Sequence, residues 1–376
     1  MTLRHAVVLA LLSLTPLPLR ADRAEPGSRE LKEAPGRAVA PRPPVDSEEL
    51  LQPALVVPAP SLLLVVPGDL RIAPREGGFV ALVPGAGGPS FTAFREDGTI
   101  EASLFSPGHA VERWWLSPDG KRVAWVSGGT LYTATAGAKA MDSLGAAPIE
   151  DLAFTRDGAH LVFVRDGVAV IRTVADRTER TVRAEPGLLL GGAAVLSADG
   201  KTLFALAGPD TPVPDGLARA GAPAADGLAS ADLTAAEPVL KRCFQASGST
   251  LRTLTLSPDG LSLAFIQAAG KPPEALRLFT PASGDVRTLA RAPMIEHPVF
   301  TADGSRMAFS GRAANGRMQA WSAATVPDVT KGVYVTRQLA ELEGREILHP
   351  APAAGGGFWL LVKDADGKAM RVGRVK

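Results

Sequence analysis

The sequence is poor in several features that would point to a particular chemistry. Of its 376 residues only one, Cys243, is a cysteine, which excludes an intrachain disulfide framework, a Cys-x-x-Cys redox pair and a cysteine-based zinc site. An excess of positive charge is also lacking, because 40 Lys and Arg face 39 Asp and Glu and leave a net charge of +1. Proteins that bind a phosphate backbone normally carry a basic excess. The composition therefore argues against nucleic acid as a partner.

Long apolar runs and hydrolase motifs are missing as well. Beyond its first residues the sequence contains no run of about 18 uncharged apolar residues, so we expect no transmembrane span in the mature chain. It contains no Gly-x-Ser-x-Gly string, the nucleophile elbow of α/β hydrolases. With 46% hydrophobic and 21% charged residues, the chain can nevertheless bury a sizeable core, which excludes wholesale disorder.

The first 21 residues match a secretory signal peptide. Arg4 gives a charged start, and the next 14 residues after His5, AVVLALLSLTPLPL, carry no charge. They are too few to span a hydrocarbon layer of about 30 Å as a helix. The small residue Ala21 marks the expected cleavage site. We therefore predict a periplasmic or secreted protein, with an uncleaved amphipathic leader as the alternative.

Residues 22–60 are predicted to form a flexible linker. Six prolines lie between positions 22 and 53 among mixed acids and bases, and such a composition cannot bury enough apolar surface to offset chain entropy. The segment is either a spacer or a tether that orders on a partner.

One short sequence motif, in which a Ser or Thr precedes an Asp-Gly pair and an apolar run follows it, recurs along the rest of the chain at a spacing near 40 residues. We call this motif the Asp-Gly phrase. Its Asp-Gly pair favours a tight turn, and the preceding Ser or Thr can hydrogen-bond the turn backbone. The run after it is rich in β-branched and aromatic residues, as a strand interior is. Each copy is therefore predicted to be a β-hairpin. The clear copies are WLSPDGKRVAWV (115–126), AFTRDGAHLVFV (153–164), VLSADGKTLFAL (195–206), TLSPDGLSLAFI (255–266) and VFTADGSRMAFS (299–310), and looser ones are IAPREGGFVALV (72–83) and PAAGGGFWLLVK (352–363).

Two further strands are predicted after the clearest copies, for example at 168–174 and 178–183. Four antiparallel strands in roughly 42 residues is the size of one propeller blade. Seven such units account for residues 69–376, so the predicted fold is an all-β β-propeller of seven four-stranded blades, with six or eight as alternatives. The last unit lacks a fourth strand. The segment SLLLVV (61–66) is predicted to supply it and close the ring, which makes 61–376 the propeller domain.

Two local expectations concern the region where the repeat spacing widens to sixty residues. Residues 209–236, dominated by Ala, Gly, Pro and Asp, are predicted to be an inserted mobile loop on one face of a blade. Cys243 is predicted to be a buried thiol in a strand, with nothing nearby except Lys241 and Arg242 to activate it.

The phrase LSPDGKRVAWV, with the strand pair that follows it, resembles the WD40-like repeat of the TolB-type propellers. This resemblance covers most of residues 69–376 and implies an exported propeller whose funnel or rim binds another envelope protein. TolB itself carries an α/β domain before its propeller, whereas here a linker precedes residue 61, so the partners of the Tol system are not carried over. The same repeat forms the gating domain of prolyl-oligopeptidase-like enzymes, but this chain has no residues left for their hydrolase domain.

The candidate ligand-binding residues are His297, His349, Glu296, Trp114 and Trp115. His297 and His349 each precede a proline at the same place in successive units, so we expect their rings side by side near the central channel. With Glu296 they could hold a transition metal or a ligand carboxylate. The alternative is that a His-Pro step simply begins a strand. Because no third ligand is evident, no metal site and no cofactor is predicted.

The two tryptophans admit two interpretations. A channel-lining aromatic that grips a peptide or sugar is one, and packing between blades is the other. No catalytic residue is assigned. The favoured function is a non-enzymatic module that binds a protein or peptide partner in the cell envelope. The alternative is a small propeller hydrolase or lyase that acts on a sugar or lactone in the central channel.

Overall fold

The computed structural model describes residues 61–66, 71–85, 87–146, 151–209, 225–313, 315–327, 334–340, 345–353, 357–364 and 370–375. The predicted signal peptide and the predicted linker lie outside these residues. The described residues form 28 β-strands and no helix. Consequently, in this part of the chain no helix is long and apolar enough to cross a membrane.

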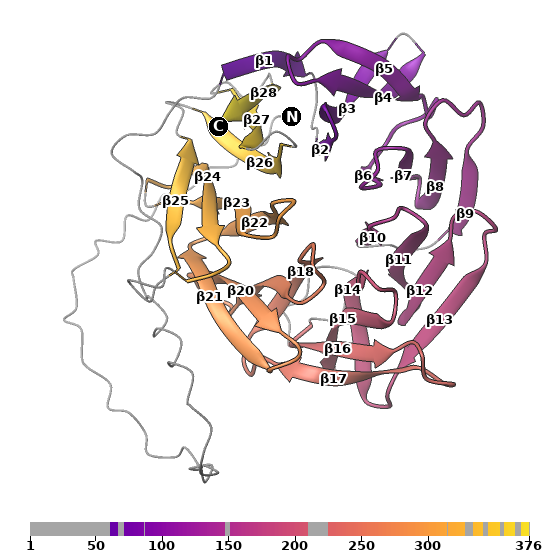
Figure 1. Cartoon of the computed structure of the whole chain (residues 1–376), viewed down its shortest axis with the longest axis vertical. Coiled ribbons are helices and arrows are strands. Elements are labelled where there is room, and N and C mark those ends of the chain that lie inside the picture. The colour runs from indigo at the N-terminus through magenta and orange to yellow at the C-terminus, as the bar shows by residue number, and fades with distance from the viewer. Residues whose placement is uncertain are drawn as a thin grey trace, which may run out of the picture. The chain divides into compact units, whose positions relative to one another are not determined.

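The strands form seven four-stranded blades around an axis, which confirms the predicted all-β propeller (Figure 1). Five of the blades are separate sheets, and two share an eight-stranded sheet. In blades 1 to 6 the first strand in the chain lies innermost, whereas in blade 7 the innermost strand is β26 and β1 is the outermost; within every blade neighbouring strands are antiparallel.

The bounds of the strands follow, blade by blade. Blades 1 to 3 comprise β2 (Ile72–Arg75), β3 (Gly78–Gly85), β4 (Gly88–Arg95) and β5 (Ile100–Phe105); β6 (Arg113–Leu116), β7 (Arg122–Ser127), β8 (Thr130–Thr135) and β9 (Asp142–Ala146); and β10 (Leu152–Phe154), β11 (His160–Arg165), β12 (Val168–Thr173) and β13 (Glu179–Ala184). Blades 4 and 5 comprise β14 (Leu188–Leu196), β15 (Thr202–Pro209), β16 (Gly227–Asp232) and β17 (Val239–Gln245); and β18 (Thr250–Leu256), β19 (Leu263–Ala268), β20 (Glu274–Thr280) and β21 (Asp285–Ala292). Blades 6 and 7 comprise β22 (Ile295–Phe300), β23 (Arg306–Arg312), β24 (Met318–Ala324) and β25 (Thr336–Ala340); and β26 (Glu346–Pro352), β27 (Phe358–Lys363), β28 (Met370–Val375) and β1 (Ser61–Val66).

The ring is closed by its first strand. β1 pairs antiparallel with β28, from Ser61 opposite Arg374 to Val66 opposite Met370. Blade 7 is thus built from both ends of the described chain, as the sequence predicts, and β28 keeps no unpaired outer edge.

The Asp-Gly phrase makes the turn between the first two strands of five blades. In blade 4 the Ser197 hydroxyl donates to Asp199 Oδ1 at 2.6 Å, and the same oxygen accepts the backbone N–H of Lys201 at 3.1 Å. Gly200 then adopts a φ of 71°, which glycine tolerates because it has no Cβ. Blades 2, 3, 5 and 6 repeat the bond from Ser or Thr to Asp at 2.5–2.7 Å. Each aspartate is therefore occupied in forming its own turn.

These turns lie next to one another on one face of the ring. A Cβ atom placed on Gly158 of blade 3 would lie 3.3 Å from Asp119 Oδ1 of blade 2. Gly260 of blade 5 is similarly close to Ala198 of blade 4. Because every inner strand runs toward this turn face, all inner strands begin at the opposite face, which we call the start face.

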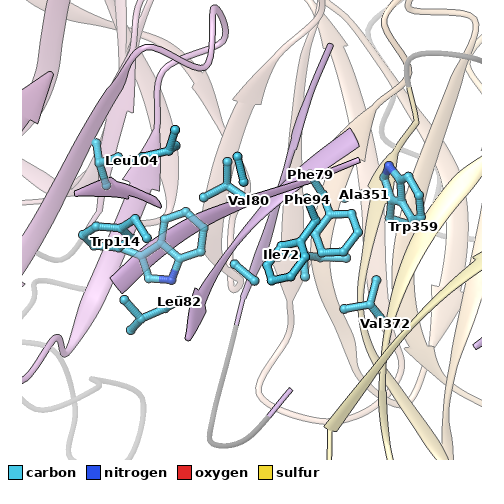
Figure 2. Packing of buried hydrophobic residues seen from close by; sticks show 14 of the residues in the cluster. Ile72, Phe79, Val80, Leu82, Phe94, Leu104, Trp114, Ala351, Trp359 and Val372 are labelled. Atoms are coloured by element: carbon cyan, nitrogen blue, oxygen red, sulfur yellow. The ribbon is translucent and has the colours of Figure 1, made fainter. Parts of the chain in front are cut away.

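Blades are held together by apolar clusters between each pair of neighbours. The second strand of a blade packs on both sides, which explains why the runs after Asp-Gly are continuously apolar instead of alternating. The cluster in Figure 2 joins blades 7, 1 and 2: Phe79 of β3 stacks on Phe94 of β4 at 5.1 Å between centroids and contacts Trp359 of β27 at 4.9 Å. Other clusters join blades 2 and 3, 3 and 4, 4 and 5, 5 and 6, and 6 and 7.

Two local predictions are wrong. The predicted insertion, 209–236, contains β16, the third strand of blade 4. Its sequence, GLASAD, is mostly small residues and therefore resembles a linker, although most of the strand is buried. Cys243 does lie in a strand, but it is exposed, because β17 is the outermost strand of its blade. Partial burial nevertheless raises the pKa of its thiol, so the expectation of an unactivated cysteine stands.

Candidate ligand-binding site at the ring axis

The candidate site lies where several inner strands begin, at the start face. Arg71 immediately precedes β2 and Asp151 immediately precedes β10, while Arg252, His297 and His349 lie near the beginnings of β18, β22 and β26. In Figure 1 these inner strands, drawn from five blades, surround the axis. We call these five residues the axial cluster.

The structure brings His297 and His349 together. They come from the inner strands of the adjacent blades 6 and 7, and their ring centroids are 4.7 Å apart with an interplanar angle of 45°. Neither ring has a hydrogen bond among the described residues, and the Nδ1 atom of His349 is buried without a partner. A buried polar atom of this kind is costly unless a ligand or water completes it.

Both imidazoles are held in their neutral form. Burial, with the positive charges of Arg71 and Arg252, lowers the pKa of His297 from 6.5 to about 4. Burial, the neighbouring His297 and Arg71 lower the pKa of His349 well below 6.5. At neutral pH each ring therefore offers one N–H donor and one nitrogen acceptor.

Two residues near the cluster have a left-handed backbone. His297 has a φ of 51°, and Thr253 of β18 has a φ of 57°. Each lies at a bulge where the pairing register of its inner strand shifts. The conformation is particularly unfavourable for a β-branched threonine. Strained backbone of this type concentrates at functional sites.

A set of hydrogen bonds fixes the strand that carries His297. Arg252 Nη2 donates to Glu274 Oε2 at 2.5 Å and to the backbone oxygen of Ile295 at 2.6 Å. The same Glu274 oxygen accepts the backbone N–H of Ile295 at 2.6 Å. Residues of blade 5 therefore bind both the backbone oxygen and the backbone N–H of Ile295, which lies two positions before His297.

His349 is positioned by its other neighbour. The buried Ser310 of β23 donates its hydroxyl to the backbone oxygen of Leu348 at 2.8 Å. Leu348 lies within the bulge of β26, where the register shifts between Ile347 and His349. This bond links blade 6 to the residue just before the ring.

On another side of the axis, Asp151 is a buried carboxyl. It accepts the indole N–H of Trp115 at 3.2 Å and the backbone N–H of Leu152 at 2.9 Å. Burial raises its pKa, although these bonds and the charges of Arg71 and Arg113 act in the opposite direction. The charge of Arg71 therefore acts on groups of blades 3, 6 and 7.

The five residues predicted from the sequence are distributed differently. Trp114 is 5% exposed and packs on Phe91 between blades 1 and 2, whereas Trp115 is half-buried and bound to Asp151. Glu296 precedes His297 in β22 and is half-buried, but its carboxylate is not among the groups that shift the pKa of either histidine.

Sequence reasoning missed Arg71, Asp151, Arg252 and Thr253. Arg71 and Asp151 each occupy the position just before an inner strand, so an alignment of the repeats by strand start could have found them. The bulge at Thr253 has no sequence signal, because threonine is untypical of left-handed backbone.

Among the residues that the structure describes, no group of three or more His, Cys, Asp or Glu side chains could hold a metal ion. The histidine pair also lies in the positive field of two arginines, which disfavours a cation.

A separate cleft of about 580 Å³ lies between blades 3 and 4 on the turn face. Its lining includes Arg156, His160 and Glu179. Glu179 is already paired with Arg165 and Arg172, and Asp157 is used by its turn. The cleft therefore offers fewer free groups than the axial cluster.

No protein-family model matches the sequence, and no curated protein matches it. Among solved structures, an oligogalacturonate lyase in complex with manganese matches with a TM-score of 0.56 and 13% identity, over 84% of this chain and 98% of that one. The β-propeller domain of Myceliophteria thermophila Cps50 (Swd1) matches with a TM-score of 0.56 and 12% identity, over 84% and 100%.

Dipeptidyl peptidase 4 of Porphyromonas gingivalis matches with a TM-score of 0.52 and 14% identity. The match covers 83% of this chain but 53% of the peptidase, so the chain spans about half of that enzyme. TolB from Acinetobacter baumannii has a TM-score of 0.45 at 16% identity, over 82% and 79%, which is too low to support an argument. At these identities the comparisons show the β-propeller fold alone.

Proposed function

We propose that the chain is an exported, non-catalytic propeller of the TolB-type repeat family that binds a protein or peptide partner of the cell envelope at the start face. Export is supported by the charged start and short apolar run of the first 21 residues. Family membership is supported by the recurring phrase LSPDGKRVAWV.

The observation that carries this proposal is the unpartnered, buried Nδ1 of His349 beside His297. Inner strands of five blades begin around the same axis, and bonds from Arg252 and Ser310 to the backbone hold the two histidine strands in place. A preorganised set of polar groups with spare hydrogen-bonding capacity is typical of a recognition site.

The same cluster is poorly suited to acid–base catalysis. A general base works best with a pKa near the working pH, whereas the pKa of His297 is lowered to about 4. Burial, Arg71 and Arg252 act on the pKa of His297, and burial, His297 and Arg71 act on that of His349. Among the described residues no carboxylate hydrogen-bonds either ring, as one does in a catalytic triad.

The proposal is tested with a photocrosslinking amino acid placed at Glu296, beside the cluster, in the full chain expressed in its source cells. A matched chain carries the same group at Arg183, which is exposed on the outer strand β13. We expect one specific envelope protein to crosslink from position 296 and none from position 183. The Arg71→Gln substitution should abolish the adduct. An adduct from position 183, or one unchanged by Arg71→Gln, would contradict binding at the cluster.

A second candidate is a small propeller lyase or hydrolase that acts on a sugar or lactone. The paired imidazoles next to Glu296 favour it, and the oligogalacturonate lyase shows that this fold can support such chemistry. Turnover of oligogalacturonate by the purified chain, lost in a His297→Asn, His349→Gln double variant that still folds, would establish it. Absence of turnover would remove it.

A further inference from the structure

We propose that the axial cluster is a carboxylate-binding site, in which the Arg71 guanidinium pairs with the carboxylate of a ligand and the His297 and His349 rings donate hydrogen bonds to it. The inference rests on the proposed function, because it names the group of the partner that this cluster recognises. We assign that group to a peptide, as its C-terminal or side-chain carboxylate.

Positive charge dominates around the histidine pair. Arg71 acts on both rings and Arg252 acts on His297. Arg252 is already engaged, since it is ion-paired with Glu274 and donates to the backbone of Ile295.

Arg71 is the arginine that remains available. It is exposed, and with the residues that the structure describes it forms no hydrogen bond or ion pair. A guanidinium presents paired donors that match the two oxygens of a carboxylate. Arg71 immediately precedes the inner strand β2, and its charge acts on both histidines and on Asp151.

The two histidines can supply further hydrogen-bond donors to the carboxylate. Each neutral ring has one N–H, and His349 Nδ1 is buried with no partner in the described structure. A carboxylate only accepts hydrogen bonds, so it can take the Arg71 donors and an imidazole N–H together. A divalent cation would instead meet the arginine charges, and the part of the chain that the structure describes offers no third His, Cys, Asp or Glu ligand.

The backbone supports a site that is built in advance. The left-handed residues Thr253 and His297 occur at bulges in the neighbouring inner strands β18 and β22. A bulge redirects side chains from the regular alternation of a strand. In β22 the bulge includes His297, whose ring lies next to that of His349.

The test uses the full-length chain with isotope-labelled histidine, observed by imidazole NMR. The chain has five histidines, so single substitutions assign the signals. Sodium acetate is titrated against sodium chloride at constant ionic strength. We expect acetate, but not chloride, to shift the His297 and His349 resonances in a saturable way while those of His109 and His160 stay unchanged.

Two variants separate the cluster from general charge effects. Arg71→Gln should weaken acetate binding at least about tenfold, the effect of losing a charged hydrogen bond. Arg75→Gln is the matched control, since Arg75 is the last residue of β2, the strand that Arg71 immediately precedes, and it pairs with Glu101. Unchanged His109 and His160 signals verify the fold of each variant. Equal weakening by the two substitutions, or none by Arg71→Gln, would overturn the inference.

Three further probes identify the source of the carboxylate. N-acetyl-diglycine should shift the two histidines, and its C-terminal amide should not. Equal shifts by the acid and the amide would overturn the carboxylate assignment while leaving the crosslinking test of function intact. Tighter binding of galacturonate than of the peptide acid would uphold the site and overturn the peptide as its ligand. Saturation of both rings by micromolar zinc chloride would overturn the proposal in favour of a metal.

Discussion

Thr253 and His297 are side chains on a backbone conformation that most residues avoid. An L-residue in this region costs about 1–2 kcal/mol, and the neighbouring strands must over-determine the geometry to keep it. Arg252 and Glu274 do so for blade 6 by binding both backbone groups of Ile295. At the scale of single residues, the left-handed backbone of Thr253 and His297 therefore lowers the stability of the inner strands near the axis.

Replacing the strained threonine should relieve part of this cost. Thr253→Asn is expected to stabilise the protein by about 1 kcal/mol, because asparagine tolerates a φ of 57° better than a β-branched residue. Urea unfolding measures the change. Thr255→Asn, at an extended position of the same strand, is the control and should be neutral or destabilising. A loss of stability in Thr253→Asn would contradict the strain argument.

Stability should also depend on the protonation of the histidine pair. The folded pKa of His297, about 4, lies below its ordinary value of 6.5, so the unfolded chain binds more protons between these values. Stability is therefore full above about pH 6.5 and falls as pH decreases toward 4. We expect a loss of about 1–2 kcal/mol between pH 7 and pH 5, after allowing for partial exposure.

Urea unfolding at pH 7 and pH 5 measures this loss. The His297→Asn, His349→Gln double variant should lose much less stability over the same interval, whereas His160→Gln should behave like the parent chain. Asp151, whose pKa is raised by burial, acts with the opposite sign, but it is present in every variant and cancels from the comparison. An identical pH dependence in the double variant would show that the two rings are not the cause.

At the scale of the element, the Asp-Gly turn stabilises its own hairpin and also contacts the neighbouring blade. Its serine or threonine, aspartate and glycine complete one another's hydrogen bonds within the turn. The same turn touches the next blade, as Gly158 touches the turn of blade 2. Arg156 extends this further, since it donates to the backbone oxygen of Pro258 in blade 5 at 2.8 Å.

The two roles can be separated with two glycines. Gly200 has no atom within 4 Å of the position of a Cβ, whereas a Cβ on Gly158 would lie 3.3 Å from Asp119 Oδ1 and from Ser117 Cβ. Gly200→Ala should therefore cost about 1 kcal/mol, from the positive φ alone. Gly158→Ala should cost about 1 kcal/mol more, because the neighbouring turn must move. Equal losses in urea unfolding would refute a contribution from the inter-blade contact.

At the scale of the whole molecule, the seven blades are stabilised by ring closure. Every blade packs on two neighbours through an apolar cluster, and blade 7 exists as a four-stranded sheet because β1 returns to β28. Blades 3 and 4 are also joined at their outer strands, where Arg183 and Ala184 pair in parallel with Val239 and Leu240.

Removing the closing strand should weaken the entire ring. A chain that starts at residue 67 loses the β1–β28 ladder and should be less stable by about 3–5 kcal/mol, from several backbone hydrogen bonds at about 1 kcal/mol each. The exposed β28 edge should promote self-association. Thermal unfolding and size-exclusion chromatography measure the two effects. A chain that starts at residue 61 is the control, and equal stability of the two chains would contradict closure by β1.

The sequence alone determined the repeating part of this protein, because that part depends on local chemistry. Asp-Gly turns and apolar second strands are visible in five copies, and counting strands predicted both seven blades and the closing role of Ser61–Val66. The sequence-based expectations were wrong at β16, which is built largely of small residues, and at Cys243, which is exposed on an outer strand. Burial at both places depends on what the neighbouring strands cover. The sequence placed His297 and His349 at equivalent positions, since a repeat conserves position.

Tertiary structure alone decided the composition of the candidate site. Arg71, Asp151 and Arg252 are far apart in sequence and lie around the same axis as the histidines because five blades begin their inner strands there. The direction in which each side chain points depends on bulges, such as the one at Thr253, for which the sequence has no recognisable signal. Likewise, the core position of Trp114 and the Asp151 contact of Trp115 follow from strand register across blades. Local patterns fix the blades, whereas contacts between blades fix the charge and hydrogen bonding at the axis.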